Sequence, residues 1–349
     1  MKNKILNEIV NTTIKLIEYK TIKDNYTEFY KAQDYIKEQL KNYYITEYKI
    51  NNYPNLVISN TKEKDLDIIF CAHLDVVPTN TYQATIKNNK LYGRGAIDMK
   101  GQLSVLISLL KNNSTTKKIT LIITSDEEIG GTCCQEILKN YNAKLAVIPD
   151  ALNNFQLVVE EKGLLQLEIT VTGKTAHASE PSKGENAILK LINIYNKLLE
   201  IYPMPTNNEY KTTINLSKIN GGTATNIVPA KATMTLDIRY EKNNTIEEII
   251  KNITKLSENI EIKILDQGPI FQVDKNLPEI ENFLKNSTQI LNHEVKVAKC
   301  VATSDAIYFS EKNIPTILMN PIGDYWHGDG EYVEINSLYT LYKIFKTLL

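Results

Sequence analysis

The sequence predicts an α/β protein with two parts: a main domain whose mostly parallel sheet is flanked by helices, and an inserted α+β domain. Short apolar runs, separated by segments with helical spacing, are typical of strands that are buried on both faces of a parallel sheet. Further along the chain the predicted order becomes β-α-β-β-α-β, which is the order of a ferredoxin-like sandwich. We therefore expect a discontinuous main domain, residues 1–162 and 275–349, and an inserted domain, residues 163–274.

Periodicity assigns the elements of the main domain. Apolar residues at helical spacing predict helices, and short unbroken runs rich in β-branched residues predict buried strands. The predicted helices cover residues 5–19, 29–43, 102–111, 136–140 and 277–291, and the predicted strands cover residues 55–59, 67–72, 117–124, 144–148 and 314–319. Because the last four of these strands are separated by helices, we expect a largely parallel sheet.

The inserted domain has a different pattern. Residues 164–172 alternate between apolar and polar, as a strand with one exposed face does. The remaining predicted elements are a helix over 184–202, strands over 212–219 and 232–240, a helix over 245–257 and a strand over 260–265. Their order predicts a sheet covered by two helices.

The composition fits a globular protein of about two domains. The chain has 349 residues, of which 42% are hydrophobic, and domains of ~150 residues are common. Its 40 Lys and Arg residues balance 41 Asp and Glu residues without a dense basic run, so we expect no nucleic-acid partner. No apolar run approaches the ~18 residues of a membrane span. The four cysteines lack CxxC spacing, which favours a reducing cytoplasm, and we expect no membrane partner.

Polar side chains follow the predicted strands of the main domain. His73 and Asp75 come directly after the strand over 67–72. Residues i and i+2 of an extended segment point to the same side, so the Asp75 carboxylate can accept the second ring N–H of His73. That arrangement is typical of a metal-bound histidine. Asp98 lies between a Gly-Arg-Gly turn and the start of the next helix, where it can face the same strand ends.

The later strands repeat this pattern. Glu127 and Glu128 follow the strand over 117–124, Asp150 follows the next strand, and His327 follows the last one. Ligand sites in open α/β sheets lie at the carboxyl ends of the strands, so we expect these side chains to meet.

Two imidazoles and three carboxylates can hold two divalent metal ions. One carboxylate would bridge the metals, and each metal would take one histidine and one further carboxylate. Zn²⁺ is the most common ion at such ligands, although Co²⁺ or Mn²⁺ can use the same ones. Glu127 and Glu128 cannot both face one way along an extended segment, so Glu127 is left as a candidate general base.

Six motifs in order give the chain a family resemblance. HLDVVP, GRGAIDMKG, TSDEEIGG, IPD, GKTAHASEP and WHGDGEYV, spread over nearly the whole chain, resemble the motif set of the M20 family of co-catalytic zinc peptidases and deacylases. That family includes succinyl-diaminopimelate desuccinylases, acetylornithine deacetylases and dipeptidases. The resemblance implies a cis peptide bond after Asp98, and it implies that the main domain is catalytic. It implies the following roles: Asp98 as the bridging ligand, His73 and Asp150 as ligands of one metal, Glu128 and His327 as ligands of the other, and Glu127 as the general base.

The resemblance also assigns roles in the inserted domain. His177 would reach into the partner subunit's active site and stabilise an oxyanion. Asn226 and Arg239 would hold the carboxylate of the substrate, a task that suits a guanidinium group. Because the insert is single, a homodimer formed through this lid domain is expected. Each of the three residues has an alternative interpretation. His177 could be a solvated loop residue, Asn226 a turn residue, and Arg239 part of a surface ion pair.

The expected activity is hydrolysis of an amide or peptide bond. An aspartate at the position of Asp150 is commoner among dipeptidase-like members of the family, which favours a short peptide as the substrate. An N-acyl amino acid deacylase, such as a succinyl-diaminopimelate desuccinylase or an acetylornithine deacetylase, is the alternative. An inactive metal-binding module is a third hypothesis, which Glu127 disfavours because metal binding alone needs no base.

Overall fold

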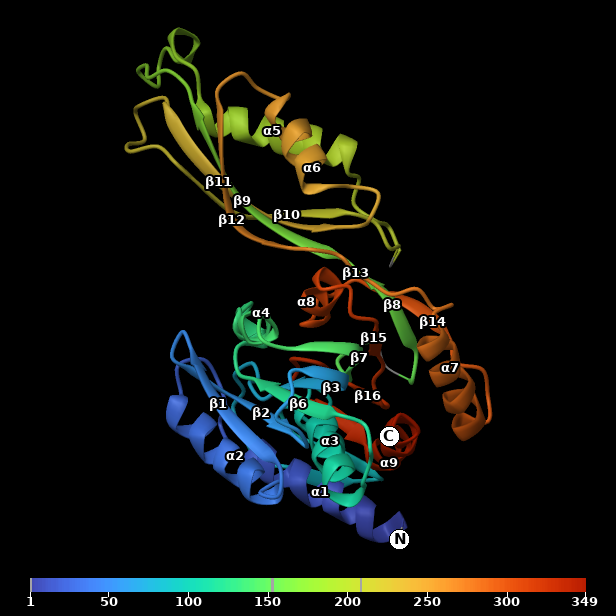
Figure 1. Cartoon of the computed structure of the whole chain (residues 1–349). Helices are drawn as coiled ribbons and strands as arrows, with labels where there is room; N and C mark the ends of the chain where they lie inside the picture. Colours follow the sequence, from blue (N-terminus) through green and yellow to red (C-terminus); the bar gives the residue numbers. More distant parts are fainter. Residues whose placement is uncertain (1, 152–153, 208) are drawn as a thin grey trace. The chain divides into compact units, whose positions relative to one another are not determined.

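The computed structural model describes residues 2–151, 154–207 and 209–349. It divides the chain into two compact units. Unit 1 comprises Met1–Glu160, Gln272–Ala298 and Ser304–Leu349, and unit 2 comprises Glu161–Phe271 and Lys299–Thr303. The mixed α/β class with a second α+β part is confirmed (Figure 1).

Unit 1 is built on one large sheet, in which the strands follow the order β1-β2-β6-β3-β7-β15-β8-β13, with β14 beside β8. The bounds are Tyr44–Ile50 for β1, Tyr53–Ser59 for β2, Asp65–His73 for β3, Ile119–Thr124 for β6, Asn142–Ile148 for β7, Leu157–Glu161 for β8, Phe271–Gln272 for β13, Val297–Cys300 for β14 and Thr316–Leu318 for β15. The central strands β6, β3, β7 and β15 run parallel, as predicted. Antiparallel neighbours extend the sheet on both sides of them.

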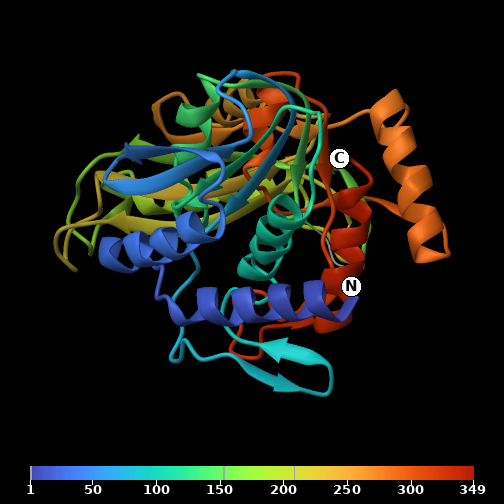
Figure 2. The ribbon, with the colours of Figure 1, turned by 60° about the horizontal axis from the view of Figure 1, so that its bottom comes forward.

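Helices cover both faces of this sheet (Figure 1). One face carries α1 (Lys2–Glu18), α2 (Tyr26–Gln39), α3 (Lys100–Asn112) and α9 (Ile335–Lys346), with α7 (Pro278–Leu291) packed on α9, and the other carries α4 (Cys133–Leu138) and α8 (Ala306–Glu311). Figure 2 shows α1 beside α9. Because the sheet is covered on both faces, every residue of β6 is buried, and its residues are apolar except for Thr120 and Thr124.

A small second sheet in unit 1 pairs a segment near residue 90 with a segment near residue 330. Its order is β16-β17-β5-β4, with β4 at Thr85–Lys87, β5 at Lys90–Tyr92, β16 at Gly323–Asp324 and β17 at Tyr332–Glu334. Tyr92 lies opposite Tyr332, so the segment that leads to Asp98 starts beside the segment that follows His327. These strands of two or three residues are too short to give a periodic signal, and the sequence did not predict them.

Unit 2 has the predicted ferredoxin-like order. It runs β9 (Gly163–Thr172), α5 (Ala187–Ile201), β10 (Thr213–Gly221), β11 (Lys231–Tyr240), α6 (Ile246–Thr254) and β12 (Ile260–Gly268). The strands pair antiparallel in the order β10-β11-β9-β12. Alternate residues of β9 are buried and pack with apolar residues of both helices, which explains the alternation in its sequence.

Helix caps move some element ends away from the prediction. The helix expected over 184–202 begins at Ala187, because the Asn186 side chain accepts hydrogen bonds from the backbone N–H groups of Ile188 and Leu189. The helix expected over 245–257 begins after Thr245, which forms a capping box with Glu248. Within the described residues, no helix has both the length and the apolar character needed to cross a membrane.

Candidate metal centre

His73 lies at the end of β3, where its imidazole is almost fully buried. Its Nδ1 contacts the backbone oxygen of Asp75 at 3.0 Å, while the nearest carboxylate oxygen of Asp75 lies 3.6 Å away. The other carboxylate oxygen of Asp75 accepts a hydrogen bond from the backbone N–H of Glu128 at 2.9 Å. Asp75 therefore supports His73 chiefly through its carbonyl group, where the sequence predicted its carboxylate, and it also fixes the loop that carries Glu128.

Asp98 lies between the two imidazoles. One carboxylate oxygen is 3.1 Å from Nε2 of His73, and the other is 3.2 Å from Nε2 of His327. The peptide bond between Asp98 and Met99 is cis, as the family resemblance implied. A carboxylate that contacts both imidazoles, one with each oxygen, has the arrangement expected of a bridging ligand.

Glu127, Glu128 and Asp150 complete the cluster. A Glu128 oxygen lies 3.0 Å from Nε2 of His327, and oxygens of Asp150 and Glu127 lie 3.7 and 4.0 Å from Nε2 of His73. Glu127 and Glu128 start a 3₁₀ helix, η1 (Glu127–Ile129), so the expectation of an extended segment was wrong. Their carboxylates still contact different imidazoles, because successive residues of a 3₁₀ helix point about a third of a turn apart.

The structure thus brings together all six residues that the sequence placed at this centre. Within this cluster, two sets of side chains could each hold a metal ion: His73 with Glu127 and Asp150, and His73 with Asp98 and Glu128. Glu127 lies almost as close to His73 as Asp150 does, so the division between ligands and base stays a prediction.

The charges of the cluster fit bound cations. Buried oxygen atoms of Glu128 and Asp75 have no hydrogen-bond partner within the described part of the chain. Burial raises the pKa of Glu127 well above its usual value, and the charge of Asp150 adds to this effect. Burial and the charge of Asp98 raise the pKa of Asp150 to about 7. Carboxylates crowded in this way are poorly compensated by two imidazoles, and nitrogen and oxygen donors of this kind suit divalent zinc.

The two imidazoles respond to the same crowding. Hydrogen bonds to Asp98 and Glu128 raise the pKa of His327 to about 10. For His73, burial on its own lowers the pKa, but hydrogen bonds to Asp75 and Asp98 outweigh burial and leave it well above its usual value. For Asp98, burial raises the pKa, but contacts with both imidazoles outweigh burial and lower it. In the absence of a metal, protons on the imidazoles would take its place.

A buried ion pair that the sequence did not reveal holds two of the loops together. The Glu331 carboxylate accepts hydrogen bonds from the Arg94 guanidinium at 2.6 Å and from the backbone N–H groups of Gly95 at 3.0 Å, Ile97 at 3.0 Å and Asp98 at 3.2 Å. Both charged side chains are buried. Glu331 therefore fixes the backbone of the segment that ends at Asp98.

Arg94 extends this connection to His327. Its second guanidinium nitrogen donates to the backbone oxygen of His327 at 2.8 Å. His327 has a left-handed backbone, with φ of 60°. The hydrogen bond from Arg94 fixes the carbonyl of this residue. A signal that could have found this ion pair is present in the sequence. Arg94 lies in the motif GRGAIDMKG and Glu331 lies in the motif WHGDGEYV, and neither residue was assigned to a metal.

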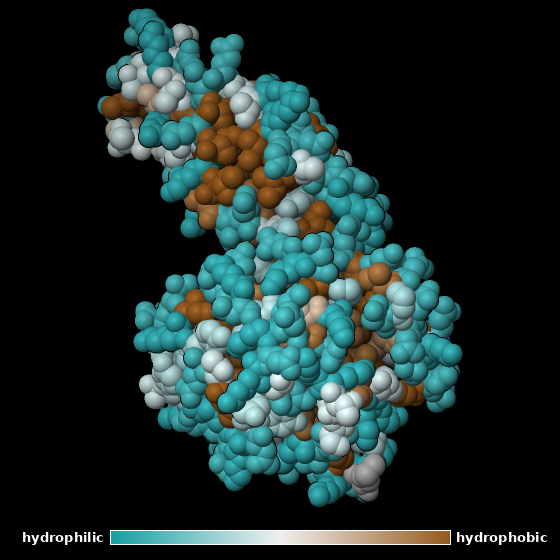
Figure 3. All heavy atoms as spheres, in the orientation of Figure 1, coloured by the Kyte–Doolittle hydropathy of each residue, from teal (hydrophilic) through white to brown (hydrophobic). Residues whose placement is uncertain are grey.

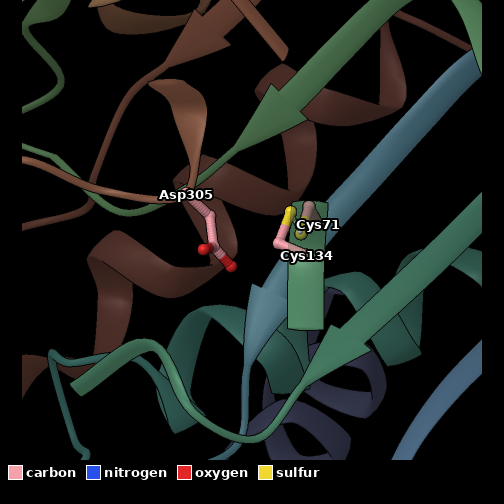
Figure 4. A group of neighbouring side chains, drawn as sticks. All are labelled: Cys71, Cys134 and Asp305. Carbon is pink, nitrogen blue, oxygen red and sulfur yellow. Dashed lines mark hydrogen bonds between the residues drawn. The ribbon is translucent and has the colours of Figure 1, made fainter. Parts of the chain in front are cut away.

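A third group of metal-binding residue types lies nearby in unit 1 (Figure 4). Figure 4 shows the Asp305 carboxylate facing the thiols of Cys71, from β3, and Cys134, from α4. The two sulfur atoms are 4.0 Å apart, and Thr124 donates to Asp305 at 3.1 Å. Burial raises the pKa of Cys134 well above its usual value. The thiols therefore stay protonated, and the group is best described as buried polar packing.

The three predicted residues of the inserted domain lie in unit 2. His177 is exposed, with Nδ1 2.7 Å from the Ser179 hydroxyl. The exposed Asn226 is in a neighbouring loop, because its backbone oxygen accepts a hydrogen bond from Ala178 at 3.0 Å. Arg239, on β11, forms an ion pair with Asp237 at 2.9 Å. Their assigned roles stay predictions.

A cluster of imidazoles and carboxylates at the carboxyl ends of parallel strands is suited to bind divalent metal ions. A family model described as peptidase family M20/M25/M40 matches residues 69–349. The chain therefore belongs to this family, and it is a metal-dependent hydrolase that acts on carbon–nitrogen bonds of amides or peptides.

Individual relatives agree with this assignment. The LysW-lysine/LysW-ornithine hydrolase of Saccharolobus solfataricus is 34% identical over 241 residues, which cover 68% of this chain and 67% of the relative. The succinyl-diaminopimelate desuccinylase of Pelagibacter ubique is 29% identical over 81% of this chain and 82% of its own. A tripeptidase of Staphylococcus aureus has the same fold, with a TM-score of 0.82 at 22% identity and 98% of each chain covered.

We predict that the metal-free protein loses thermal stability as the pH rises. Asp150 binds its proton more tightly in the folded state, with a pKa of about 7 against an ordinary 3.8. The stability that this proton contributes is therefore lost as the pH rises from 3.8 to about 7. His327 has a pKa of about 10 against an ordinary 6.5, so its contribution to stability is lost as the pH rises from 6.5 to about 10. Melting temperatures of the chelated protein should fall across both intervals, and Asp150→Asn should flatten the lower one. A melting temperature of the chelated protein that rises with pH would contradict the prediction.

We predict that Glu331→Gln weakens metal binding. The amide places an N–H donor where the native carboxylate accepts several N–H groups, so the Asp98 and His327 loops should loosen. Loss of a group that orients metal ligands costs roughly 10–100-fold in metal affinity. Calorimetric titration with zinc measures this affinity, and Asp329→Asn, which removes a charge from the same motif at an exposed position, is the control. Equal zinc affinity in Glu331→Gln and the wild-type protein would contradict it.

Proposed function

We propose that this chain is a co-catalytic di-zinc hydrolase that cleaves the amide bond of a short peptide. The observation that carries the proposal is the Asp98 carboxylate, which contacts His73 with one oxygen and His327 with the other. A single carboxylate placed in this way can join two metal ions.

The residues would divide between the two ions as follows: Asp98 bridges them, His73 and Asp150 hold one ion, and His327 and Glu128 hold the other. Bound divalent ions supply Lewis acidity, which polarises a carbonyl group and makes water acidic enough to lose a proton near neutral pH. Co²⁺ or Mn²⁺ would supply the same chemistry through the same residues. Asp75 would hold the His73 ring and the Glu128 backbone in place during the reaction.

Glu127 would be the general base. Its carboxylate lies beside the cluster, 4.0 Å from Nε2 of His73. Burial raises its pKa, which makes it a stronger base than an exposed glutamate. Glu127 would take a proton from the attacking water and then return this proton to the departing amine nitrogen. This proton transfer is also the reason to prefer an enzyme over an inactive binding module.

Unit 2 would act as a lid and dimerisation domain, with its functional boundaries at residues 163–274. His177 would stabilise the oxyanion in the active site of the second subunit, and Asn226 and Arg239 would hold the substrate carboxylate. Exposed apolar side chains on this unit support a homodimer, and Figure 3 shows a hydrophobic patch on its surface. They include Leu189 and Ile192 of α5, Ile219 of β10, and Ile227.

The cysteines support a cytoplasmic location. All four are buried and none forms a disulfide in the structure. Unpaired cysteines are the norm in a reducing compartment. The partners that we propose are a small or short-peptide substrate and a second copy of this chain, without nucleic acid or membrane.

A second candidate function is the hydrolysis of N-acylated amino acids. The observation that favours it is the sequence similarity to an amino-acid conjugate hydrolase and to a desuccinylase. The first candidate is favoured by Asp150, since an aspartate at this position is the commoner residue in dipeptidase-like family members. Both candidates use the same metal centre and the same base.

We predict that the zinc-loaded protein cleaves free dipeptides faster than N-acetyl or N-succinyl amino acids. Release of free amino acids from both sets, assayed side by side, measures this preference. Glu127→Ala should keep both metals and lose activity by orders of magnitude, roughly 10²–10⁴-fold for a general base. Cleavage of the acylated set alone would favour the second candidate. Full turnover by Glu127→Ala would exclude Glu127 as the base.

A further inference from the structure

The backbone leaves the large sheet directly after His73. β3 ends at this residue, so the polar backbone groups of the loop that follows need partners outside the strand pairing. The N–H of Leu74 donates to the carbonyl of Thr124 at 2.8 Å. Two further groups of this loop, the carbonyl of Leu74 and the N–H of Val76, bind to a segment more than fifty residues earlier in the sequence.

Thr21 binds both of these groups. It lies between α1 and α2, and none of its surface is exposed. Its hydroxyl donates to the carbonyl of Leu74 at 2.7 Å, and its own carbonyl accepts the N–H of Val76 at 2.9 Å. These two residues flank Asp75, whose backbone oxygen contacts the ring of His73. Thr21 therefore fixes the loop on both sides of the group that orients this imidazole.

Lys100 ties the Thr21 segment to Asp98. It begins α3, two residues after Asp98, and it is completely buried. Its ammonium group donates to the carbonyl of Tyr19 at 2.8 Å, and the N–H of Thr21 donates to the same carbonyl at 2.9 Å. Within the described part of the chain, this carbonyl is the one hydrogen-bond acceptor of the ammonium group. The two segments meet because α1 packs on α3.

The surroundings of Lys100 offset the cost of burying its charge. A buried ammonium group with a single neutral acceptor is unfavourable. The carboxylates of Glu331, Asp75 and Glu28 attract this charge. The stem of Lys100 is closely packed as well, since a Cβ added at Gly95 would lie 2.8 Å from its Cδ. Two of these carboxylates, Glu331 and Asp75, are the ones that hold the loops of the metal centre, so Lys100 belongs to the same buried network.

This connection acts on a different imidazole from the Arg94–Glu331 pair. That pair joins the Asp98 segment to the carbonyl of His327. The connection through Lys100 and Thr21 joins the Asp98 segment to the loop of His73 instead.

We propose that Thr21 and Lys100 are positioning residues for the metal ion held by His73, so that each ion of the centre has a buried support of its own. The inference rests on the proposed function, which assigns His73 to one ion and His327 to the other. Loss of the Thr21 hydroxyl would weaken the first ion and leave the second in place.

The experiment is a calorimetric titration of the metal-free full chain with zinc. Thr21→Val keeps the shape of the side chain and removes its hydroxyl. One of the two binding events should weaken by roughly 10–100-fold, the usual loss when a group that orients a metal ligand is removed, and the other should stay unchanged. Lys100→Met should have the same effect. Thr21→Ser, which keeps the hydroxyl, should bind both ions as the wild-type protein does.

Thr13→Val is the matched control. Thr13 is equally buried, and its hydroxyl donates to the carbonyl of Ile9 at 2.9 Å within α1, away from the loops of the metal centre. This variant loses a comparable hydrogen bond, so it should lower the melting temperature and leave both zinc affinities unchanged.

Variants of the ligands assign the weakened event to one ion. In a His73→Ala background the supported ion is absent, so adding Thr21→Val should not change the affinity for the remaining ion. In a His327→Ala background Thr21→Val should still weaken the remaining ion. Wild-type affinities in Thr21→Val, an equal loss in Thr13→Val, or a loss that persists in the His73→Ala background would overturn the proposal.

A spectroscopic measurement separates positioning from general stability. The visible absorption of the Co²⁺-loaded protein reports the geometry around the metal, so it should change in Thr21→Val and return in Thr21→Ser. An unchanged spectrum in Thr21→Val would also overturn the proposal. If Lys100→Met fails to fold, as judged by circular dichroism, the Thr21 variants still decide. A protein that shows the predicted loss of zinc affinity and yet hydrolyses no amide would retain the inference and refute the proposed function.

Discussion

The Glu331 carboxylate is the group on which the geometry of the metal centre depends. It accepts the backbone N–H groups of three residues on the segment that ends at Asp98, and it pairs with Arg94, which in turn holds the carbonyl of His327. Two ligands more than two hundred residues apart in the sequence are thereby fixed relative to each other. Because the pair is buried, removing either partner would leave an uncompensated charge, which is more costly than the loss of the contact itself.

The need to balance the negative charge of the clustered carboxylates explains the other properties of the candidate metal centre in unit 1. Carboxylates this close together are unfavourable without cations, and burial together with the neighbouring carboxylate charges raises the pKa of Glu127 and of Asp150. Under the proposed assignment, the same crowding would destabilise the metal-free protein, favour the binding of cations and make Glu127 a stronger base.

The sequence predicted what local patterns determine. Buried strands such as β6 are largely apolar runs without a charged residue, and parallel strands end at one edge, so His73, Glu128 and Asp150 could be expected to meet. The order of unit 2 followed from alternation and helical spacing in the same way. The Arg94–Glu331 pair could not be predicted, since its partners are 237 residues apart and the strands that join them have two or three residues. The 3₁₀ turn at Glu127 was missed because a single turn has no periodicity.

The most direct test of the central claim, a two-metal centre bridged by Asp98, is the number of zinc ions bound per chain. The protein is saturated with zinc, freed of excess metal and analysed for zinc and protein content. The account predicts two zinc ions per chain, the loss of both in Asp98→Ala and the loss of neither in Asp305→Ala. Fewer than two ions in the wild-type protein, or two ions retained by Asp98→Ala, would contradict it.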